Sequence, residues 1–336
     1  MGLAKEFCRS IIFQHHMNVE QNAGLPENYN RREFLRQTIA GVGLAAVGGE
    51  ALALEATPTQ QMPMIQLGSH QVSRLILGSN QMLGYSHTSG LLSHLMTDYY
   101  TVDNMGKVLE RSLALGVNTW QTSVSEKVDK TLEDLRSRGH DIKWIFLASH
   151  PHLEDTKALK EIIQRNKPIA VVHHGVVTDG YWRDGQVEKA HDFVKRVQDL
   201  GVLGGLSSHN PAVIHHAEEQ GWNPDFYMTA FYRVSRARDE LKTELGEAPL
   251  GEVFLGSDPP RMCEAIRQAK RPCLAFKILA AGRNCESAAQ VSNAFAFAFK
   301  NIKRSDAIIV GVFPRFRDEI LEDANLTAQF SALSQA

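Results

Sequence analysis

Three short apolar segments of the chain end in histidine side chains. "IKWIFLASH" ends at His150, "IAVVHHG" contains His173 and His174, and "VLGGLSSHN" contains His209. Imidazole changes its charge near neutral pH, so it can act as a general acid, a general base or a metal ligand. If the fold brings these segment ends together, the sequence predicts a catalytic histidine cluster.

A lysine is the second group with chemistry of its own. Lys277 lies inside the apolar segment "CLAFKILAAG". A desolvated ammonium group loses its proton more easily, so this lysine can serve as a base, a Schiff-base former or a charge clamp. A lysine on the helix side of the segment, or one paired with a carboxylate, explains the same pattern. Both interpretations stay open.

Eight apolar runs of strand length recur between residues 64 and 330, and helical patterns alternate with them. This alternation predicts a single α/β domain, a (β/α)8 TIM barrel. An open doubly wound sheet is the alternative, but no G-x-G-x-x-G turn follows the first run. The expected strands lie within 74–79, 117–123, 142–150, 169–175, 202–210, 226–233, 272–282 and 307–312. The expected helices lie at 103–115, 128–138, 156–165, 188–200, 211–220, 260–270, 286–300 and 317–330.

The carboxyl ends of parallel barrel strands share one mouth, where barrel enzymes place their active sites. A residue there can also simply hydrogen-bond to its own loop. Three consecutive strands that end in histidine favour a common site. The strand-end residues are Asn80, Gln121, His150, His173 or His174, His209, Tyr232, Lys277 and Phe313.

Net charge and cysteine pattern exclude two classes of partner. The formal net charge is -2, and no block of lysine and arginine is present, so we expect no nucleic-acid partner. Cys263, Cys273 and Cys285 form no C-x-x-C pair, which argues against a zinc site of the cysteine type.

The first 53 residues have the pattern of an export signal. Arg31-Arg32 precedes a weakly apolar run, residues 38–49, and the small-residue site Ala51-Leu52-Ala53. This pattern predicts a twin-arginine signal, recognition by the twin-arginine export machinery, and a mature chain that begins near Leu54 in the periplasm or another extracytoplasmic space. The run is too short and glycine-rich for a stable membrane anchor.

Several segments together resemble the aldo-keto reductases. "MIQLGSHQVSRLILGSNQMLG" is similar to the family's N-terminal β-hairpin and first strand, and "LALGVNTWQTS" to its second strand. "LASH", "VVHHG" and "GLSSHN" resemble the third, fourth and fifth strands, and "AIIVGVFPRFRDEILEDANL" resembles the closing segment. The resemblance covers nearly all of residues 64–330. It implies hydride transfer between NADP and the carbonyl group of a small molecule.

The catalytic residues of that family are mostly absent. Gln121 stands at the position of its aspartate, "TSVSEKV" after it contains no tyrosine, and His150 stands at the position of its lysine. Only the fourth-strand histidine, His173 or His174, is retained. Because glutamine cannot pair with a lysine as a carboxylate does, the family's usual proton donation is not encoded. We expect catalysis by His173, His174, His150, Gln121, His209 and Lys277 instead.

Two long loops, 80–101 and 233–260, are expected at the mouth, where long loops usually bind ligands. The first loop offers groups that suit a polar or sugar-like carbonyl substrate and that can replace the missing proton donor. These groups are Tyr85, His87, His94, Tyr99 and Tyr100.

The resemblance also implies a set of cofactor-binding residues. Ser208 and Asn210 follow the fifth strand, the backbone from Leu279 to Gly282 follows the seventh, and Gly311, Arg315 and Arg317 follow the eighth, where phosphates are expected. The two arginines can equally be solvated charges at the start of a helix.

Three functions remain open. The first is an exported aldo-keto-reductase-like oxidoreductase with altered catalytic residues. It would have to keep its NADP bound, because free NADPH is not expected outside the cytoplasm. The second is a non-redox lyase, isomerase or hydrolase that uses the histidine cluster, with or without a divalent metal, although no local ligand motif assigns metal residues. The third is a non-catalytic binding barrel.

Overall fold

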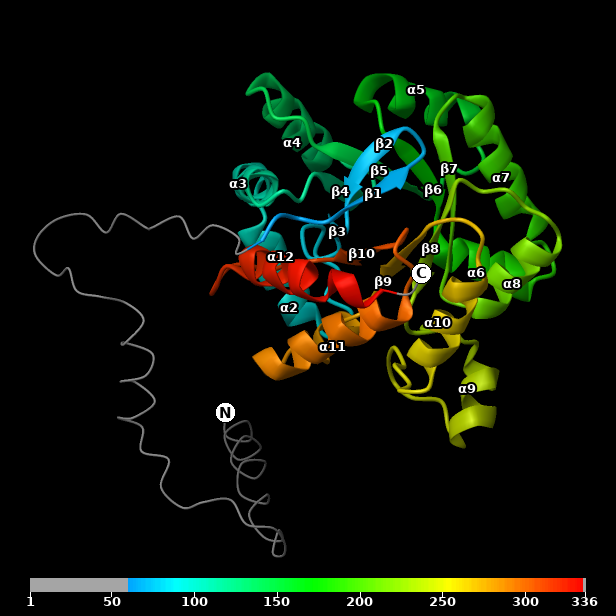
Figure 1. The fold of residues 1–336 in the computed structure, drawn as a ribbon. Coiled ribbons are helices and arrows are strands. Elements are labelled where there is room, and N and C mark those ends of the chain that lie inside the picture. Colours follow the sequence, from blue (N-terminus) through cyan, green and yellow to red (C-terminus); the bar gives the residue numbers. More distant parts are fainter. Residues whose placement is uncertain (1–59, 335–336) are drawn as a thin grey trace, which may run out of the picture. The chain divides into compact units, whose positions relative to one another are not determined.

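The computed structural model describes residues 60–334, which contain a closed barrel of eight parallel strands. The strands follow the order β10-β3-β4-β5-β6-β7-β8-β9 around the barrel, and helices cover its outside (Figure 1). The predicted (β/α)8 TIM barrel is confirmed, whereas the predicted signal over residues 1–53 lies outside the described residues. The barrel strands are β3 (Leu75–Leu77), β4 (Thr119–Thr122), β5 (Lys143–Ala148), β6 (Ala170–His173), β7 (Leu203–Ser208), β8 (Phe226–Ala230), β9 (Cys273–Phe276) and β10 (Ala307–Val310).

An antiparallel hairpin precedes the barrel, as expected. It consists of β1 (Met64–Leu67) and β2 (His70–Ser73), joined by a turn at Gly68, where φ is +57°. A side chain at Gly68 would collide with Leu203, the first residue of β7. The hairpin therefore closes the amino-terminal end of the barrel and leaves the other end for a site.

Alternate residues of each strand face the barrel interior. Ile76, Ile145 and Val172 belong to the inner apolar cluster, whereas their neighbours pack against the helices. This two-residue period is a property of every β-strand. Whether a strand-end side chain reaches the mouth therefore depends on a single step along the chain.

The helices agree with the expected positions to within a few residues, and three of them were not expected. α2 and α9 lie inside the two predicted long loops, and α6 begins directly after β6. All three are short, and they bury few or no large apolar side chains: α2 buries Met96, whereas α6 and α9 bury none. Their apolar pattern in the sequence is therefore weak. The helices are α2 (Gly90–Tyr99), α3 (Val102–Ala114), α4 (Glu126–Ser137), α5 (Thr156–Asn166), α6 (Gly175–Arg183), α7 (Glu188–Asp199), α8 (Pro211–Glu219), α9 (Arg238–Leu245), α10 (Asp258–Gln268), α11 (Ala288–Asn301) and α12 (Glu319–Phe330).

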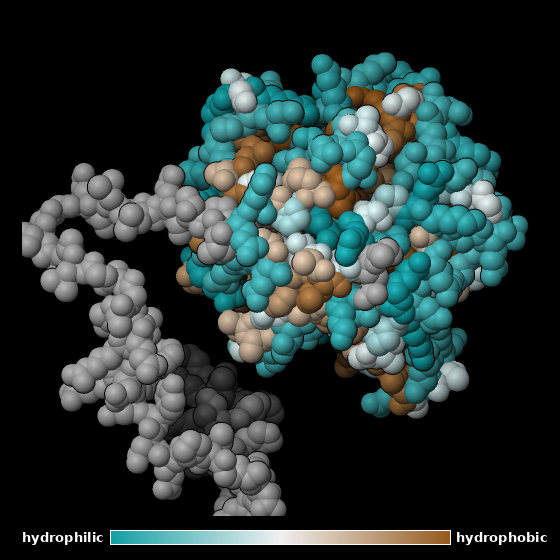
Figure 2. All heavy atoms as spheres, in the orientation of Figure 1, coloured by the Kyte–Doolittle hydropathy of each residue, from teal (hydrophilic) through white to brown (hydrophobic). Residues whose placement is uncertain are grey.

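The face that carries the hairpin is mostly hydrophilic, with smaller apolar areas among the polar side chains (Figure 2). Within residues 60–334, none of the helices combines the length and apolar character that crossing a bilayer requires.

Candidate active site

His173 and His174 point to opposite sides of the barrel wall. His173 faces the helices, where its Nδ1 lies 2.7 Å from Thr178 Oγ1 and its ring packs edge-on against Phe193. Burial lowers the pKa of His173 to about 3. The prediction that His173 belongs to the mouth is therefore corrected, because its register places it outside the barrel, where it acts as a neutral core residue.

His174 has the inward register of Ala170 and Val172, and it is also the N-cap residue of helix α6. Its Nδ1 accepts a hydrogen bond from the Val176 backbone N–H at 3.3 Å. In the neutral ring the proton must then be on Nε2, so His174 has a hydrogen-bond donor left for a ligand.

The charge of His174 is controlled by its surroundings. Burial, followed by repulsion from His209, His150 and Lys277, lowers its pKa to about 4, and the Asp179 carboxylate opposes this shift. His209, His150 and Lys277 therefore all lie near His174. At neutral pH His174 is therefore an uncharged donor and not a proton source.

His209 forms a buried pair with Asp179 of α6. Its Nδ1 lies 2.9 Å from Asp179 Oδ2, and both side chains are at most 5% exposed. Asp179 also accepts hydrogen bonds from the His209 backbone N–H and from Ser208 Oγ. Although burial raises the pKa of Asp179, the hydrogen bond from His209 and its positive charge outweigh this effect and hold the pKa below the usual value. Asp179, which sequence reasoning missed because α6 was not expected, fixes the His209 ring.

The closest set of reactive groups joins both long loops to the end of β9. Lys277 Nζ lies 3.2 Å from His87 Nε2, and His87 Nδ1 lies 2.9 Å from the Glu252 carboxylate. Asn80 Nδ2 also reaches His87 Nε2, at 2.8 Å. Lysine and amide nitrogens only donate, so His87 Nε2 is the acceptor. The proton of the neutral ring is therefore on Nδ1, which donates a hydrogen bond to the Glu252 carboxylate.

Lys277 is mostly buried, and burial lowers its pKa to about 8, while the Glu252 carboxylate opposes this shift. Its backbone is unusual as well. Lys277 has a φ of +60° and His87 a φ of +57°, a region that costs a residue with a side chain roughly 1–2 kcal/mol. Strained residues that contact one another at a strand end point to function more than to stability.

Gln121 and Ser207 leave unpaired polar atoms inside the barrel. Gln121 lies level with the inward-facing Ile145, and neither its Nε2 nor Ser207 Oγ has a partner among the described residues. Such atoms are costly to bury unpaired, so a polar ligand or water that reached them would satisfy them. His150 lies on the rim instead, with its side chain 55% exposed and paired with Glu154.

The remaining groups of the first loop make no hydrogen bond with Lys277 in the described part of the chain. Tyr100 is fully buried and donates to the Val312 carbonyl oxygen, and burial raises its pKa. Tyr99 packs against Tyr100, whereas Tyr85 and His94 are exposed. Of the five groups in the first loop, His87 is the one that contacts Lys277.

Two predicted cofactor residues serve the protein's own structure. Ser208 Oγ donates to Asp179, and the register of Ser208 points it away from the interior. The Asn210 side-chain oxygen accepts from the Ala212 backbone N–H and so caps α8. Only the Asn210 amide nitrogen is left for a ligand.

Access to the residues after β10 is restricted. The Gln81 amide covers Gly311 and occupies the space that a side chain would fill there. Arg317 lies 3.6 Å from Glu319 and 3.4 Å from Glu322, so its charge is compensated. Arg315 is exposed beside the ring of Phe316.

The turn after β9 is open. Ala280, Ala281 and Gly282 all have φ near or above +50°, and a side chain at Gly282 would meet no atom within 4 Å. The turn therefore has room for a ligand at Gly282, whereas Ala280 is buried and the N–H groups of Ala280 and Gly282 donate to the carbonyl oxygens of Lys277 and Leu279. Gly282 is thus the accessible part of the predicted Leu279–Gly282 segment.

In the described part of the chain, no group of three histidine, cysteine, aspartate or glutamate side chains is arranged to hold a metal ion. The outward direction of His173 and the exposed position of His150 account for this result. The possible divalent metal thus has no candidate ligand set among these residues.

The comparisons with known proteins yield structural neighbours alone. No family model and no curated protein matches the chain. Solved structures of Gox0644 match it, one without ligand at 12% identity and a TM-score of 0.46, and one of a variant in complex with NADPH at 10% identity and a TM-score of 0.47. Each match covers 82% of this chain and 95% of that chain.

Proposed function

We propose that the protein is an oxidoreductase of the aldo-keto reductase type with altered catalytic residues, which acts on a small polar or sugar-like carbonyl compound. The observation that carries this proposal is the hydrogen-bonded chain from Glu252 through His87 to Lys277 at the barrel mouth. It supplies a charged proton donor, a role that tyrosine has in the family.

Lys277 donates a proton to the carbonyl oxygen of the substrate. With a pKa of about 8, its ammonium group is charged at neutral pH yet acidic enough to transfer a proton. The negative charge of Glu252, which is paired with His87, helps to keep Lys277 charged despite burial. The Nε2–H group of His174 is a second donor to the same oxygen, and it stays uncharged throughout.

NADP is the proposed cofactor, on the resemblance to the family. Gly282, at the accessible end of the Leu279–Gly282 segment, and the exposed Arg315 would hold its phosphates. When bound in its reduced form, it supplies the hydride. Export through the twin-arginine machinery to the periplasm remains part of this proposal, on the Arg31-Arg32 pattern.

The first test is a fluorescence titration of the chain with NADPH, followed by NADPH oxidation with glycolaldehyde and glyceraldehyde as substrates. We expect micromolar binding, turnover by the wild type, and at least about 100-fold lower turnover by Lys277→Met with unchanged NADPH binding. Absence of binding at millimolar NADPH would overturn the redox function.

A second candidate is a non-redox isomerase or lyase. Contacts at three expected cofactor residues favour it, because the protein's own groups already engage Ser208, Gly311 and Arg317. The His209–Asp179 pair also favours it, since such a pair suits a general base. Proton exchange next to the carbonyl of dihydroxyacetone, followed by NMR in heavy water without cofactor, tests it. Exchange that His209→Asn abolishes would support this function, and no exchange above background would exclude it for this substrate.

A further inference from the structure

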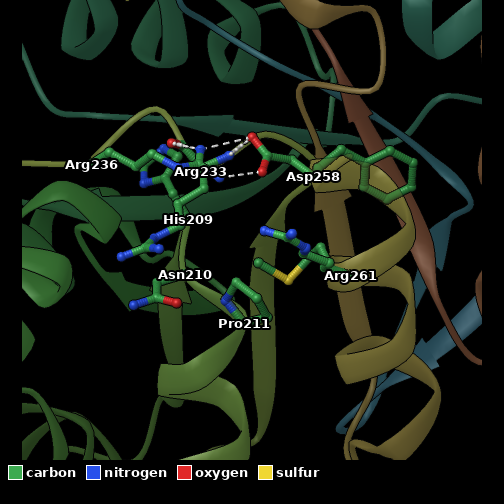
Figure 3. Close-up of a pocket in the computed structure, with 9 residues that line it drawn as sticks. His209, Asn210, Pro211, Arg233, Arg236, Asp258 and Arg261 are labelled. Atoms are coloured by element: carbon green, nitrogen blue, oxygen red, sulfur yellow. Dashed lines mark hydrogen bonds and ion pairs between the residues drawn. The ribbon is translucent and has the colours of Figure 1, made fainter. Parts of the chain in front are cut away.

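A small pocket opens beside His209, between the ends of β7 and β8 and the first turn of α10 (Figure 3). It is not formed by the Lys277 chain or by the Leu279–Gly282 turn. The polar residues that line it are His209, Asn210, Arg233, Arg236, Asp258 and Arg261.

Positive charge predominates in the lining of this pocket. Arg236 and Asp258 form a buried ion pair at 2.5 Å, with both side chains at most 3% exposed, and Arg233 pairs with Glu240 outside the lining. The charges of Arg236 and Arg233 are therefore compensated within the protein. Arg261 makes no hydrogen bond or ion pair with any residue between 60 and 334, and Figure 3 shows its guanidinium pointing across the pocket toward the end of β7.

Two buried polar side chains also have nitrogen atoms left for a ligand. Asn210 is 6% exposed and uses its oxygen to cap α8, so its amide N–H groups have no partner within residues 60–334. His209 is 4% exposed and uses Nδ1 for Asp179, so Nε2 remains. The amino ends of α8 and α10 lie at the same pocket, and their dipoles favour a negative charge.

The pocket adjoins the proposed catalytic groups. The His209 ring packs edge-on against Phe276 at 5.4 Å, and Phe276 directly precedes Lys277. On its other side the His209 ring lies against Gly175, the residue after His174, where an added side chain would come within 3.2 Å of His209 Cε1. A substrate that reaches Lys277 with its carbonyl group can therefore place another group beside His209.

We propose that this pocket binds an anionic group, a phosphate or a carboxylate, of the carbonyl substrate. Arg261 supplies the uncompensated charge, and Asn210 and the helix ends supply neutral donors. The inference rests on the proposed function for the identity of the carbonyl compound, although binding of the anion itself does not require turnover.

The experiment is a calorimetric titration of the full chain with inorganic phosphate, in the presence and absence of NADP. We expect saturable binding that Arg261→Gln weakens about tenfold or more, since a charged hydrogen bond is lost. Arg267→Gln, an exposed arginine on the same helix, is the matched control and leaves binding unchanged. Asn210→Asp keeps the helix cap but adds a negative charge, so it also weakens binding.

Three results would overturn the inference. These are phosphate binding that does not saturate, equal weakening by Arg261→Gln and Arg267→Gln, and displacement of phosphate by NADP, which would assign the pocket to the cofactor. Lys277→Met separates the two proposals, because it removes turnover while phosphate binding stays at the wild-type value. Loss of turnover alone therefore counts against the proposed function and not against the pocket.

Discussion

Lys277 Nζ lies 3.2 Å from His87 Nε2, although the two residues are 190 positions apart in the chain. Both backbones adopt the left-handed region, and Glu252 from the second long loop completes the set on the far side of His87. Three separate segments therefore converge on one ammonium group. This convergence gives the proposed function its clearest tests.

The first test concerns the pH dependence of turnover. Burial lowers the pKa of Lys277 to about 8, so the charged proton donor is present below this pH and is lost as the pH rises through it. We expect kcat to fall above pH 8 in the wild type. Lys277→Arg stays charged, so its lower activity should show no decline near pH 8. An identical decline in that variant would assign the titration to another group.

Glu252 is expected to act on Lys277 through charge. Its carboxylate opposes the effect of burial, so Glu252→Gln should lower the pKa of Lys277 and move the decline in kcat to lower pH, with roughly tenfold lower kcat at pH 8. Glu247→Gln, an exposed residue of the same loop, is the control. A shift of equal size in the control would indicate a general surface-charge effect.

His173 and His174 are expected to respond in opposite ways to substitution. His174→Asn keeps a side chain that caps α6 but removes the Nε2–H donor, so kcat should fall about 100-fold while unfolding free energy changes by less than about 1 kcal/mol. His173→Gln should destabilise the fold by roughly 2 kcal/mol and leave kcat nearly unchanged. Urea unfolding and steady-state rates measure both effects, and a reversed pattern would contradict the inward register of His174.

Acid should destabilise the barrel through His173. Its pKa is about 3 in the folded protein and near 6.5 when the chain unfolds, so the unfolded state binds the extra proton first as the pH falls. The contribution of this residue is therefore present above about pH 6.5 and is lost below it, by roughly 3 kcal/mol at pH 4.5. The comparison is urea unfolding at pH 7 and pH 4.5, in the wild type and in His173→Gln. An unchanged difference between the two pH values in the variant would show that other groups cause it.

The sequence by itself determined the barrel, because a strand-length apolar run followed by a helical pattern is a local signal, repeated eight times here. Strand ends at His174, His209 and Lys277 could be located in the same way. The three short helices α2, α6 and α9 escaped detection, since short segments with a weak apolar stripe have no strong period.

Tertiary structure alone decided which of these side chains meet. His173 and His174 are neighbours in the chain, and a single step of strand register sends one outward and the other to the mouth. The contacts of Lys277 with His87, of His87 with Glu252 and of His209 with Asp179 each join distant segments. Local patterns identify a strand or helix, but such pairings depend on barrel closure and on the paths of the loops, which no local period encodes.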